Sequence, residues 1–506
     1  MAVGVAAGAV STAMSRAPAG LAAPPVRVEV HIGRGLPAFA LVGLPEAVVR
    51  ESRERVRSAL LTSGFEFPAS RITVNLSPAD LPKEGGRFDL PIALAILAAD
   101  GQLPQDMLGE REFYGELALS GELRETPKLL PALVEGTRSG HELIVPAANV
   151  LEASWVAEPR VKLARHLREV CRALRGQGSL PSAPPSARPP VGPRADLADV
   201  RGQFTAKRAL EVAAAGAHGL LLVGCPGAGK TMLAQRLPGL LPPLQDREAL
   251  EVATLQSAAG KRPPLTCDRP FRSPQHTASV AALLGGASLR PGELSLAHLG
   301  VLFLDELPEF PRNALEALRE PLESGVVALS RAKRSCEFPA NFQLIAAMNP
   351  CPCGYAGDRG GRCRCTPGEL ARYRNRISGP LIDRIDMHVE LTAVPADQLL
   401  REDPPAAECS AAVAARVALA RRAQLERQGK LNGRLAPKEI ACHCRLDRES
   451  RGLLGAAIRR LGLSARAHHH VMKVARTCAD LSGEPEISPA AVAEAIGFRA
   501  LDRATC

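Results

Sequence analysis

The stretch Gly224-Cys225-Pro226-Gly227-Ala228-Gly229-Lys230-Thr231 follows an apolar run, Gly219 to Val223, and precedes a predicted helix, Lys230 to Leu237. Glycines at this spacing let backbone N–H groups turn onto phosphate oxygens at a helix N-terminus, which favours anions. Lys230 would reach the β- and γ-phosphates, and Thr231 would ligate Mg²⁺ through its hydroxyl. A chance glycine-rich turn is the alternative, but the strand, the helix and both side chains are in register. The stretch therefore predicts a P-loop that binds ATP and Mg²⁺.

Two further apolar runs end in polar residues of the kind such a site needs. Gly300 to Leu304 is a predicted buried strand that delivers Asp305 and Glu306 at its carboxyl end, where sites in α/β proteins lie. Asp305 would hold Mg²⁺ through water, and Glu306 would polarise the attacking water. A third strand, Phe342 to Ala347, leads to Asn349, whose amide would orient that water beside the γ-phosphate. Standing alone, Asn349 before a proline would indicate only a turn.

The surrounding chain divides into predicted domains. Pro, Ser and Gly are dense over residues 176–195, which predicts a linker. A strand and helix mixture precedes it over residues 1–175, and an α/β nucleotide-binding core follows over 196–395. The chain becomes rich in Ala and Arg over 396–506, which predicts a helical domain ending in a helix with Ser488 as its N-cap.

Composition limits the classes of partner and compartment. The chain has 506 residues, a net charge of +10 and only 3% aromatic residues. The positive charge is compatible with nucleic acid or a mildly basic enzyme, and the scarcity of aromatics disfavours base-stacking platforms. We expect no membrane span and no signal peptide, because the apolar start is short and lacks a basic leader. The expected location is therefore the cytoplasm, where thiols stay reduced.

Four of the thirteen cysteines are clustered in a short loop. The pairs are Cys351 with Cys353 and Cys363 with Cys365, separated by residues rich in Gly, Asp and Arg. Four thiols in a loop that cannot build its own core predict a structural Zn²⁺ site, with unliganded thiols as the alternative. Such a zinc clip would position the loop after Asn349.

The P-loop, Asp305-Glu306 and the strand-end Asn349 together resemble the AAA+ superfamily. Several other stretches narrow the resemblance to the ComM/YifB family of magnesium-chelatase-like AAA+ ATPases over nearly the whole chain. The stretches are Leu41 to Ser52, Arg71 to Asp80, Arg269 to Thr277, Arg376 to Asp386, Leu463 to Ala467 and Lys473 to Thr477. The family usually has His where Gln275 stands, and Tyr-His-Arg where His468-His469-His470 stands.

The resemblance implies the fold class: an α/β AAA+ P-loop core with a C-terminal helical lid, preceded by an α+β domain like the C-terminal domain of Lon protease. It also implies a ring, expected to be a homo-hexamer, with ATP between subunits. Arg384 then matches the arginine finger that reaches a neighbour's ATP. Arg466 matches the lid arginine called sensor 2, contacting the γ-phosphate in cis. The alternatives are an ion pair of Arg384 with Asp383 or Asp386, and an ordinary surface role for Arg466.

A Lon protease needs a serine nucleophile and an activating lysine. The corresponding loop here, Glu84 to Asp89, contains no serine, and Pro131 stands about where the lysine would fall. We therefore expect a non-proteolytic domain used for assembly or DNA contact.

Two functions are compatible with this reading. The first is a ring ATPase acting on single-stranded or branched DNA, as implied by the family's role in branch migration during DNA uptake and homologous recombination. A predicted hairpin, Val326 to Phe338, has Arg331, Lys333 and Arg334 at its tip, where they could grip phosphates; a solvated turn is the alternative. The second is a chelatase motor subunit that drives metal insertion into a porphyrin. Such subunits lack the Lon-like domain, which favours the DNA motor.

Overall fold

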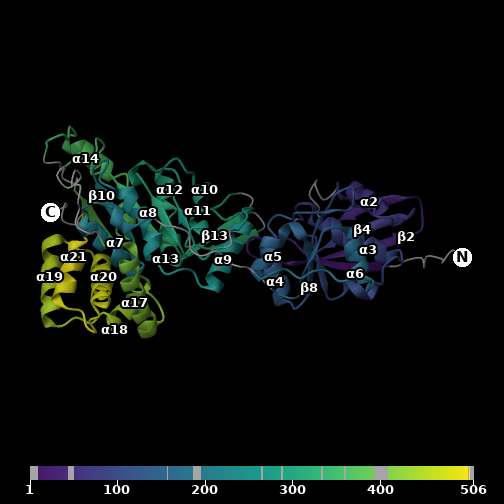
Figure 1. The fold of residues 1–506 in the computed structure, drawn as a ribbon. Helices are drawn as coiled ribbons and strands as arrows, with labels where there is room; N and C mark the ends of the chain where they lie inside the picture. The colour runs from purple at the N-terminus through teal and green to yellow at the C-terminus, as the bar shows by residue number, and fades with distance from the viewer. Residues whose placement is uncertain are drawn as a thin grey trace. The chain divides into compact units, whose positions relative to one another are not determined.

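The structure is a computed structural model of the chain, and it separates into two compact units. It describes residues 10–43, 51–81, 83–156, 158–185, 195–263, 266–286, 289–331, 334–357, 360–392, 408–499 and 501. Unit 1 contains residues 1–190, 246–266 and 289–291, and unit 2 contains the remainder. Figure 1 labels the elements of both units.

Unit 1 is built on a seven-stranded mixed sheet in the order β3-β4-β2-β1-β5-β8-β9. Strands β4, β2 and β1 pair antiparallel, and β1, β5, β8 and β9 pair parallel. The strands of unit 1 are β1 Val10–Arg16, β2 Pro25–Gly33, β3 Ala38–Val42, β4 Arg71–Ser77, β5 Arg111–Phe113, β6 Glu116–Leu117, β7 Leu123–Arg124, β8 Glu142–Pro146 and β9 Val161–Ala164. This mixture confirms the α+β character predicted for the first segment.

The helices of unit 1 bury their apolar residues on this sheet. All eleven residues of helix α3 are buried, and the helix packs against β1 and β2. An apolar helix without a polar face requires such burial. The helices are α2 Ser52–Thr62, α3 Asp89–Ala99, α4 Leu130–Arg138, α5 Val150–Val156, α6 Leu167–Leu174 and α9 Asp246–Ala258.

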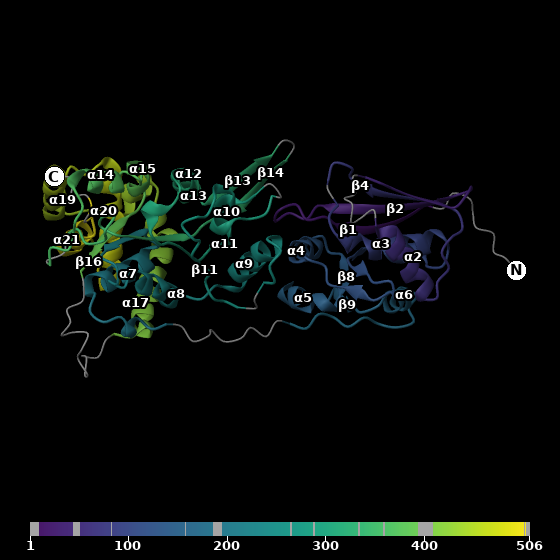
Figure 2. The ribbon, with the colours of Figure 1, turned by 90° about the horizontal axis from the view of Figure 1, so that it is seen from above.

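Helix α9 belongs to unit 1 although its sequence lies beyond the P-loop. It packs on α4, as Figure 2 shows, and Ser257 donates a hydrogen bond of 2.5 Å to the buried carboxylate of Glu152. Residues 246–266, which lie within the core predicted for 196–395, thus pack with the N-terminal unit.

Part of the predicted linker, residues 176–195, pairs with β9. Ala183 is buried, and its N–H donates to the carbonyl of Val161 in β9 at 2.9 Å. The carbonyl of Pro181 accepts the N–H of Leu163. The chain thus runs along the edge of the sheet after residue 176, and residues 186–194 of the predicted linker lie outside the described residues.

Unit 2 contains a five-stranded sheet in the order β11-β12-β15-β10-β16, with every neighbouring pair parallel. Strand β10 (Leu220–Gly224) lies between β15 (Gln343–Met348) and β16 (Met387–Leu391), and the other strands are β11 Phe271–Arg272 and β12 Val301–Leu304. These strands confirm the three buried strands predicted from sequence. The carboxyl ends of the parallel strands β10, β12 and β15 therefore lie at the same edge of the sheet, where ligand sites of α/β proteins occur.

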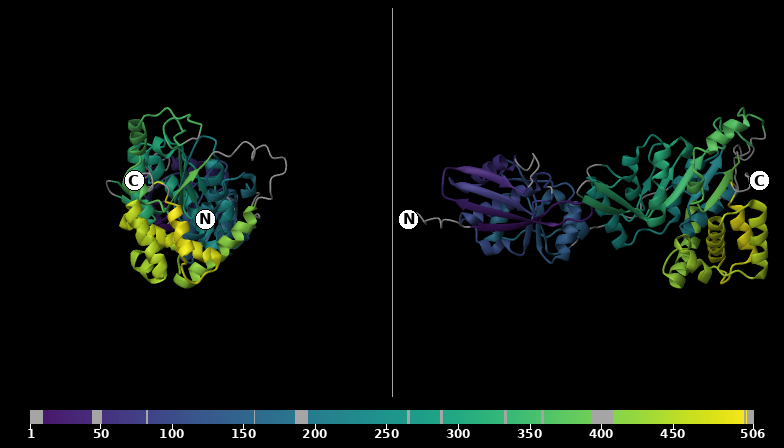
Figure 3. Two further views of the ribbon diagram at one scale, coloured as in Figure 1. Left: turned by 90° about the vertical axis from the view of Figure 1, so that its left-hand side faces the viewer. Right: turned by 180° about the vertical axis from the view of Figure 1, so that it is seen from behind.

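The helices of unit 2 cover this sheet and form a C-terminal group, which Figure 3 shows in yellow and yellow-green. Those that accompany the sheet are α7 Phe204–Gly216, α8 Lys230–Leu240, α10 Val280–Leu284, α11 Glu293–Leu296, α12 Arg312–Glu316, α13 Arg319–Ser324, α14 Pro367–Arg374 and α15 Gly379–Ile382. The C-terminal group is α17 Ser410–Gln428, α18 Pro437–His443, α19 Arg448–Leu461, α20 Ala465–Ser482 and α21 Pro489–Gly497. Ser488 caps α21 by accepting the N–H of Ala491, as predicted.

The predicted hairpin is present as β13 (Val326–Arg331) and β14 (Arg334–Pro339), which pair antiparallel up to Arg331 opposite Arg334. Lys333 at its tip lies outside the described residues, and the side chains of the two flanking arginines are not described. Among the described residues, no helix is both long and apolar enough to cross a membrane.

Candidate nucleotide site

The P-loop turns from β10 into α8 through two glycines in conformations that other residues rarely adopt. Gly227 has φ +79° and Gly229 has φ +91°, and Gly229 is the N-cap of α8. A β-carbon at Gly224 would lie 2.8 Å from the carbonyl oxygen of Leu391, so only glycine fits beside β16 there. The glycines are therefore required by the backbone path that exposes N–H groups at the start of α8.

Lys230 lies at the centre of this loop and is nine-tenths buried. Its Nζ donates to the carbonyls of Gly224 at 2.6 Å and Cys225 at 3.1 Å, and to Oδ1 of Asn349 at 3.0 Å. Burial lowers the pKa of Lys230, while the nearby carboxylates of Asp305 and Glu306 act in the opposite direction. The structure thus brings the predicted lysine and the predicted strand-end asparagine into direct contact.

Thr231 and Asp305 meet across the end of the sheet. The Thr231 hydroxyl donates to Oδ2 of Asp305 at 2.8 Å. A hydroxyl and a carboxylate held together beside a phosphate-binding loop are the oxygen ligands that Mg²⁺ accepts. The two residues predicted to bind Mg²⁺ therefore fit that ion.

Glu306 follows directly, in a left-handed backbone conformation with φ 53°. Its own N–H donates to Oδ1 of Asp305 at 2.9 Å, which fixes the turn that carries both carboxylates. Its Oε2 lies 3.4 Å from Nδ1 of His276. His276 comes from the segment between β11 and α10, so a residue distant in sequence faces the predicted water-polarising carboxylate.

Arg384 and Arg466 converge on a single carboxylate of unit 2, that of Glu323 on α13. Arg384 lies 2.8 Å from Oε1 of Glu323 and Arg466 lies 3.0 Å from the same oxygen. Arg466 also lies 3.6 Å from Asp383. Among the residues that the structure describes, Arg384 therefore pairs with Glu323 and not with Asp383 or Asp386, the alternative partners.

Asp386 instead lies buried between two histidines. Nδ1 of His218 is 3.3 Å from its carboxylate, and Nδ1 of His470 donates to the other oxygen. Burial acts to raise the pKa of Asp386, but the two histidines hold it well below its ordinary value. His470, which replaces the arginine expected from the family resemblance, thus contacts this aspartate directly.

The four predicted zinc ligands are together in space. The Sγ atoms of Cys351, Cys353, Cys363 and Cys365 all lie within 4.8 Å of one another. Cys351 is 3.3 Å from Cys353 and 3.8 Å from Cys363, and Cys353 is 3.7 Å from Cys363. A tetrahedral zinc with bonds of about 2.3 Å separates its sulfurs by about 3.8 Å.

Backbone donors to the sulfurs add to this fit. The N–H of Ala356 lies 3.2 Å from Sγ of Cys351. Hydrogen bonds from the N–H groups of Arg364 and Tyr355 lower the pKa of Cys353 to about 6. Thiolates stabilised in this way are the form that binds metal. The cluster could therefore hold a zinc ion.

Three contacts of this site were not predicted. His276 faces Glu306, Tyr373 receives the backbone N–H of Asn349, and Glu323 joins the two arginines. His276 lies in the stretch Arg269 to Thr277, which resembles the family, so the sequence could have indicated that it belongs to the site. Nothing in the local sequence marks Tyr373 or Glu323, because each acts through a contact made only in the fold.

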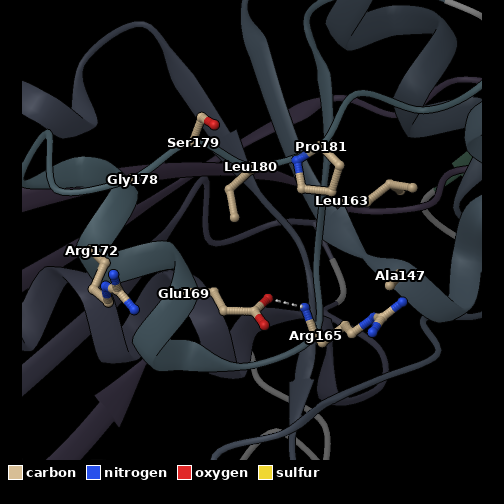
Figure 4. Close-up of a pocket in the computed structure, with 9 residues that line it drawn as sticks. All are labelled: Ala147, Leu163, Arg165, Glu169, Arg172, Gly178, Ser179, Leu180 and Pro181. Atoms are coloured by element: carbon tan, nitrogen blue, oxygen red, sulfur yellow. Dashed lines mark hydrogen bonds between the residues drawn. The ribbon is translucent and has the colours of Figure 1, made fainter.

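A separate pocket of about 410 Å³ lies in unit 1, between β9, α6 and the segment that follows α6 (Figure 4). Glu169 reaches from α6 to accept the backbone N–H of Arg165 at 2.9 Å. Leu163, Leu180 and Pro181 supply much of the apolar lining. None of the residues predicted for nucleotide or metal binding lines this pocket.

The parallel sheet, the P-loop and the carboxylates at its edge define an α/β P-loop protein, and comparison with known families agrees. A model described as "Magnesium chelatase, subunit ChlI" matches residues 196–399. "Subunit ChlI of Mg-chelatase" matches 28–149, and "Magnesium chelatase, subunit ChlI C-terminal" matches 407–499. The chain thus has a ChlI-type N-terminal domain, an AAA+ ATPase core and a C-terminal helical domain.

Comparison with individual proteins identifies the family within the class of α/β P-loop proteins. The competence protein ComM of Haemophilus influenzae is 49% identical over 498 residues, 97% of each chain. The protein YifB of Escherichia coli is 48% identical over 492 residues, again 97% of each. The Magnesium-chelatase 67 kDa subunit of Heliobacterium mobile is 29% identical over 38% of this chain and 30% of its own. The chain belongs to the ComM/YifB family of magnesium-chelatase-like AAA+ ATPases.

Proposed function

We propose that the chain is an ATP-hydrolysing ring motor that acts on DNA, with branch migration in natural transformation and homologous recombination as its role. The observation that carries the ATPase part is the meeting of Lys230, Thr231, Asp305 and Asn349 at the carboxyl edge of one parallel sheet. The DNA part is supported by full-length similarity to a competence protein and by the net charge of +10.

In this proposal the residues of one chain bind and orient ATP. The P-loop from Gly224 to Thr231 encloses the phosphates, and Lys230 exchanges part of its carbonyl and amide partners for phosphate oxygens. Thr231 and Asp305 would hold Mg²⁺, which neutralises charge on the phosphates. Glu306 polarises the attacking water, and Asn349 orients it.

A neighbouring subunit supplies a further positive charge that acts on the phosphates of ATP. Arg384 acts as the arginine finger, leaving Glu323 for a phosphate oxygen of the neighbour's ATP. Arg466 shares the carboxylate of Glu323 with Arg384 in the free chain, and we propose that it acts as sensor 2 by leaving Glu323 for the γ-phosphate in cis. This arrangement needs a closed ring with heterologous contacts, and we propose a homo-hexamer.

The N-terminal unit is proposed to be a Lon-like domain without protease activity, used for assembly or DNA contact. The hydroxyl of Ser52 is fully buried and donates to Asp89, which also accepts Nε of Arg55 at 2.7 Å. Lys128 is paired with Glu84 at 3.0 Å. Neither side chain is free to serve as a nucleophile or its base. The free thiols of all twelve described cysteines are consistent with a cytoplasmic location.

The alternative function is a chelatase motor subunit driving metal insertion into a porphyrin. The match to a magnesium-chelatase subunit covers 38% of this chain, whereas the match to ComM covers 97%. The larger share of the chain covered by ComM therefore favours the DNA motor.

The test is the ATPase rate of the intact chain with and without single-stranded or branched DNA at low salt. We expect DNA to stimulate turnover, and replacing Arg331, Lys333 and Arg334 in the hairpin by alanine to reduce stimulation by about 10-fold, because lost phosphate contacts weaken binding steeply. The matched control removes three exposed arginines elsewhere, Arg124, Arg138 and Arg422, and should keep it. No stimulation and no DNA binding at low salt would refute the DNA function.

A further inference from the structure

The four-cysteine loop begins and ends at parts of the nucleotide site. Asn349 follows β15, and Cys351 comes two residues later. Cys365 immediately precedes Thr366, which caps α14 with a capping box to Glu369. Helix α14 then returns Tyr373, whose buried hydroxyl accepts the backbone N–H of Asn349. The segment made of the loop and α14 therefore begins next to Asn349 and returns to contact it through Tyr373.

The same loop also contacts the P-loop. A β-carbon built on Gly354 would lie 2.7 Å from both Cδ and Cγ of Pro226, and 4.0 Å from Cγ of Asn349. Gly354 has φ +85°, so it packs its bare backbone against the proline ring. Pro226 and Asn349 are thus both held by residues of this loop, and Asn349 in turn holds Lys230.

Little besides the cysteines can keep the loop in place. Among the described residues of the segment 351–365, only Cys351 and Gly354 are buried. One of these is a thiol of the cluster, and the other is the residue that touches Pro226. A segment with so small a core of its own does not hold a fixed shape without a crosslink or a metal.

We infer that a zinc ion bound by Cys351, Cys353, Cys363 and Cys365 holds Gly354 against Pro226 and fixes Asn349, so that metal occupancy sets the nucleotide affinity of the P-loop. This inference rests on the proposed function for the identity of the nucleotide, but not on any action on DNA. Zinc takes no part in hydrolysis, because all four of its ligands come from the protein. Loss of the metal frees the loop, and the P-loop loses the surface that orders it.

Two kinds of variant distinguish the effect of zinc binding from the effect of the contact between Gly354 and Pro226. The double substitution Cys363→Ser and Cys365→Ser removes two ligands. The substitution Gly354→Ala keeps all four cysteines but places a methyl group into Pro226. Its matched control is Gly357→Ala, since Gly357 has a similar φ of +79° and nothing within 4 Å of a β-carbon. Both substitutions place alanine at a similar positive φ, so their backbone strain is similar. They differ only in the clash of the new methyl group with Pro226, which Gly354→Ala has and Gly357→Ala lacks.

The measurements are zinc content by mass spectrometry, affinity for a fluorescent ATP analogue, and ATP turnover, all on the full chain. We expect one zinc per chain in the natural sequence, in Gly354→Ala and in Gly357→Ala, and none in the cysteine variant. Nucleotide affinity should fall about 10²-fold in both the cysteine variant and Gly354→Ala, because small displacements in a binding site have effects of this size. Gly357→Ala should bind as the natural chain does.

Three results would overturn the inference. They are absence of zinc from the natural chain purified under reducing conditions, unchanged nucleotide affinity after loss of zinc, and equal affinities of Gly354→Ala and Gly357→Ala. Circular dichroism of each variant checks that the rest of the chain is folded. If nucleotide binding depends on zinc but DNA has no effect on turnover, the DNA function fails while this inference stands.

Discussion

At the scale of single residues, the polar groups of the nucleotide site have protein partners before any ligand arrives. Lys230 is held by two carbonyls and by Asn349, and Thr231 is held by Asp305. Oε2 of Glu306 lies 3.4 Å from Nδ1 of His276. The site is therefore ordered in advance, which reduces the reorganisation needed when phosphate enters.

Asp386 leads to a prediction about stability and pH. Its pKa is held well below the ordinary value because two histidines outweigh burial. A lowered pKa in the folded state adds stability above the unfolded value, about 3.9, and that stability is lost as pH falls through the folded value. Asp386→Asn should reduce the free energy of unfolding by about 3–5 kcal/mol, because it leaves the histidines without their buried partner.

Urea unfolding followed by circular dichroism measures this difference between the natural chain and Asp386→Asn. The difference should stay constant from pH 6 down to about 4 and shrink only at lower pH. A stability advantage of the natural chain that grows as pH falls from 6 toward 4 would mean that burial wins and raises the folded pKa of Asp386, because a raised pKa removes stability above the unfolded value.

At the scale of elements, helix α9 joins the part of the chain after the P-loop to unit 1. Its Ser257 and the N–H of Leu130 both reach the carboxylate of Glu152, which is buried and also accepts Asn149 at 2.8 Å. Burial raises the pKa of Glu152, and these hydrogen bonds act against that rise. The contact between α4 and α9 is therefore centred on one buried carboxyl group.

Glu152→Ala should release α9. It leaves the Ser257 hydroxyl and one N–H of the Asn149 amide without their buried acceptor, which costs about 2–3 kcal/mol, while the N–H of Leu130 keeps Ser257 as an acceptor. We expect faster hydrogen exchange in residues 246–258 and a lower free energy of unfolding. Glu125→Ala is the control, since the ion pair of Glu125 with Arg262 is exposed to solvent, which screens it. Equal effects of the two substitutions would show that Glu152 does not hold the helix.

The elements also show which parts of the fold and of the site could be predicted from the sequence. The strands β10, β12 and β15 and the glycines of the P-loop were predictable, since apolar runs and turn glycines act locally. The docking of α9 was not, because its amphipathic pattern does not say which unit it covers. The cysteine cluster was visible as spacing, but its contact with Pro226 through Gly354 was not, because it depends on two loops meeting. The shared partner of Arg384 and Arg466, Glu323, carries no sequence signal of its own.

At the scale of the whole molecule, our proposal divides the catalytic site between subunits. Lys230 and Asn349 belong to one half. Arg384, which the free chain holds on Glu323, belongs to the other half. The proposal of a ring follows from this division, since Arg384 of one subunit then completes the P-loop of the next.

Mixing two inactive variants tests this division most directly. Lys230→Ala removes one half of the site and Arg384→Ala removes the other, so each alone should lose turnover by about 10³-fold or more. In a random equal mixture, about a quarter of the interfaces in a ring of heterologous contacts combine an intact P-loop with an intact arginine. We predict that turnover returns in the mixture in proportion to those interfaces. Mixed rings that form but stay inactive, or full turnover by Arg384→Ala alone, would contradict a site shared between subunits.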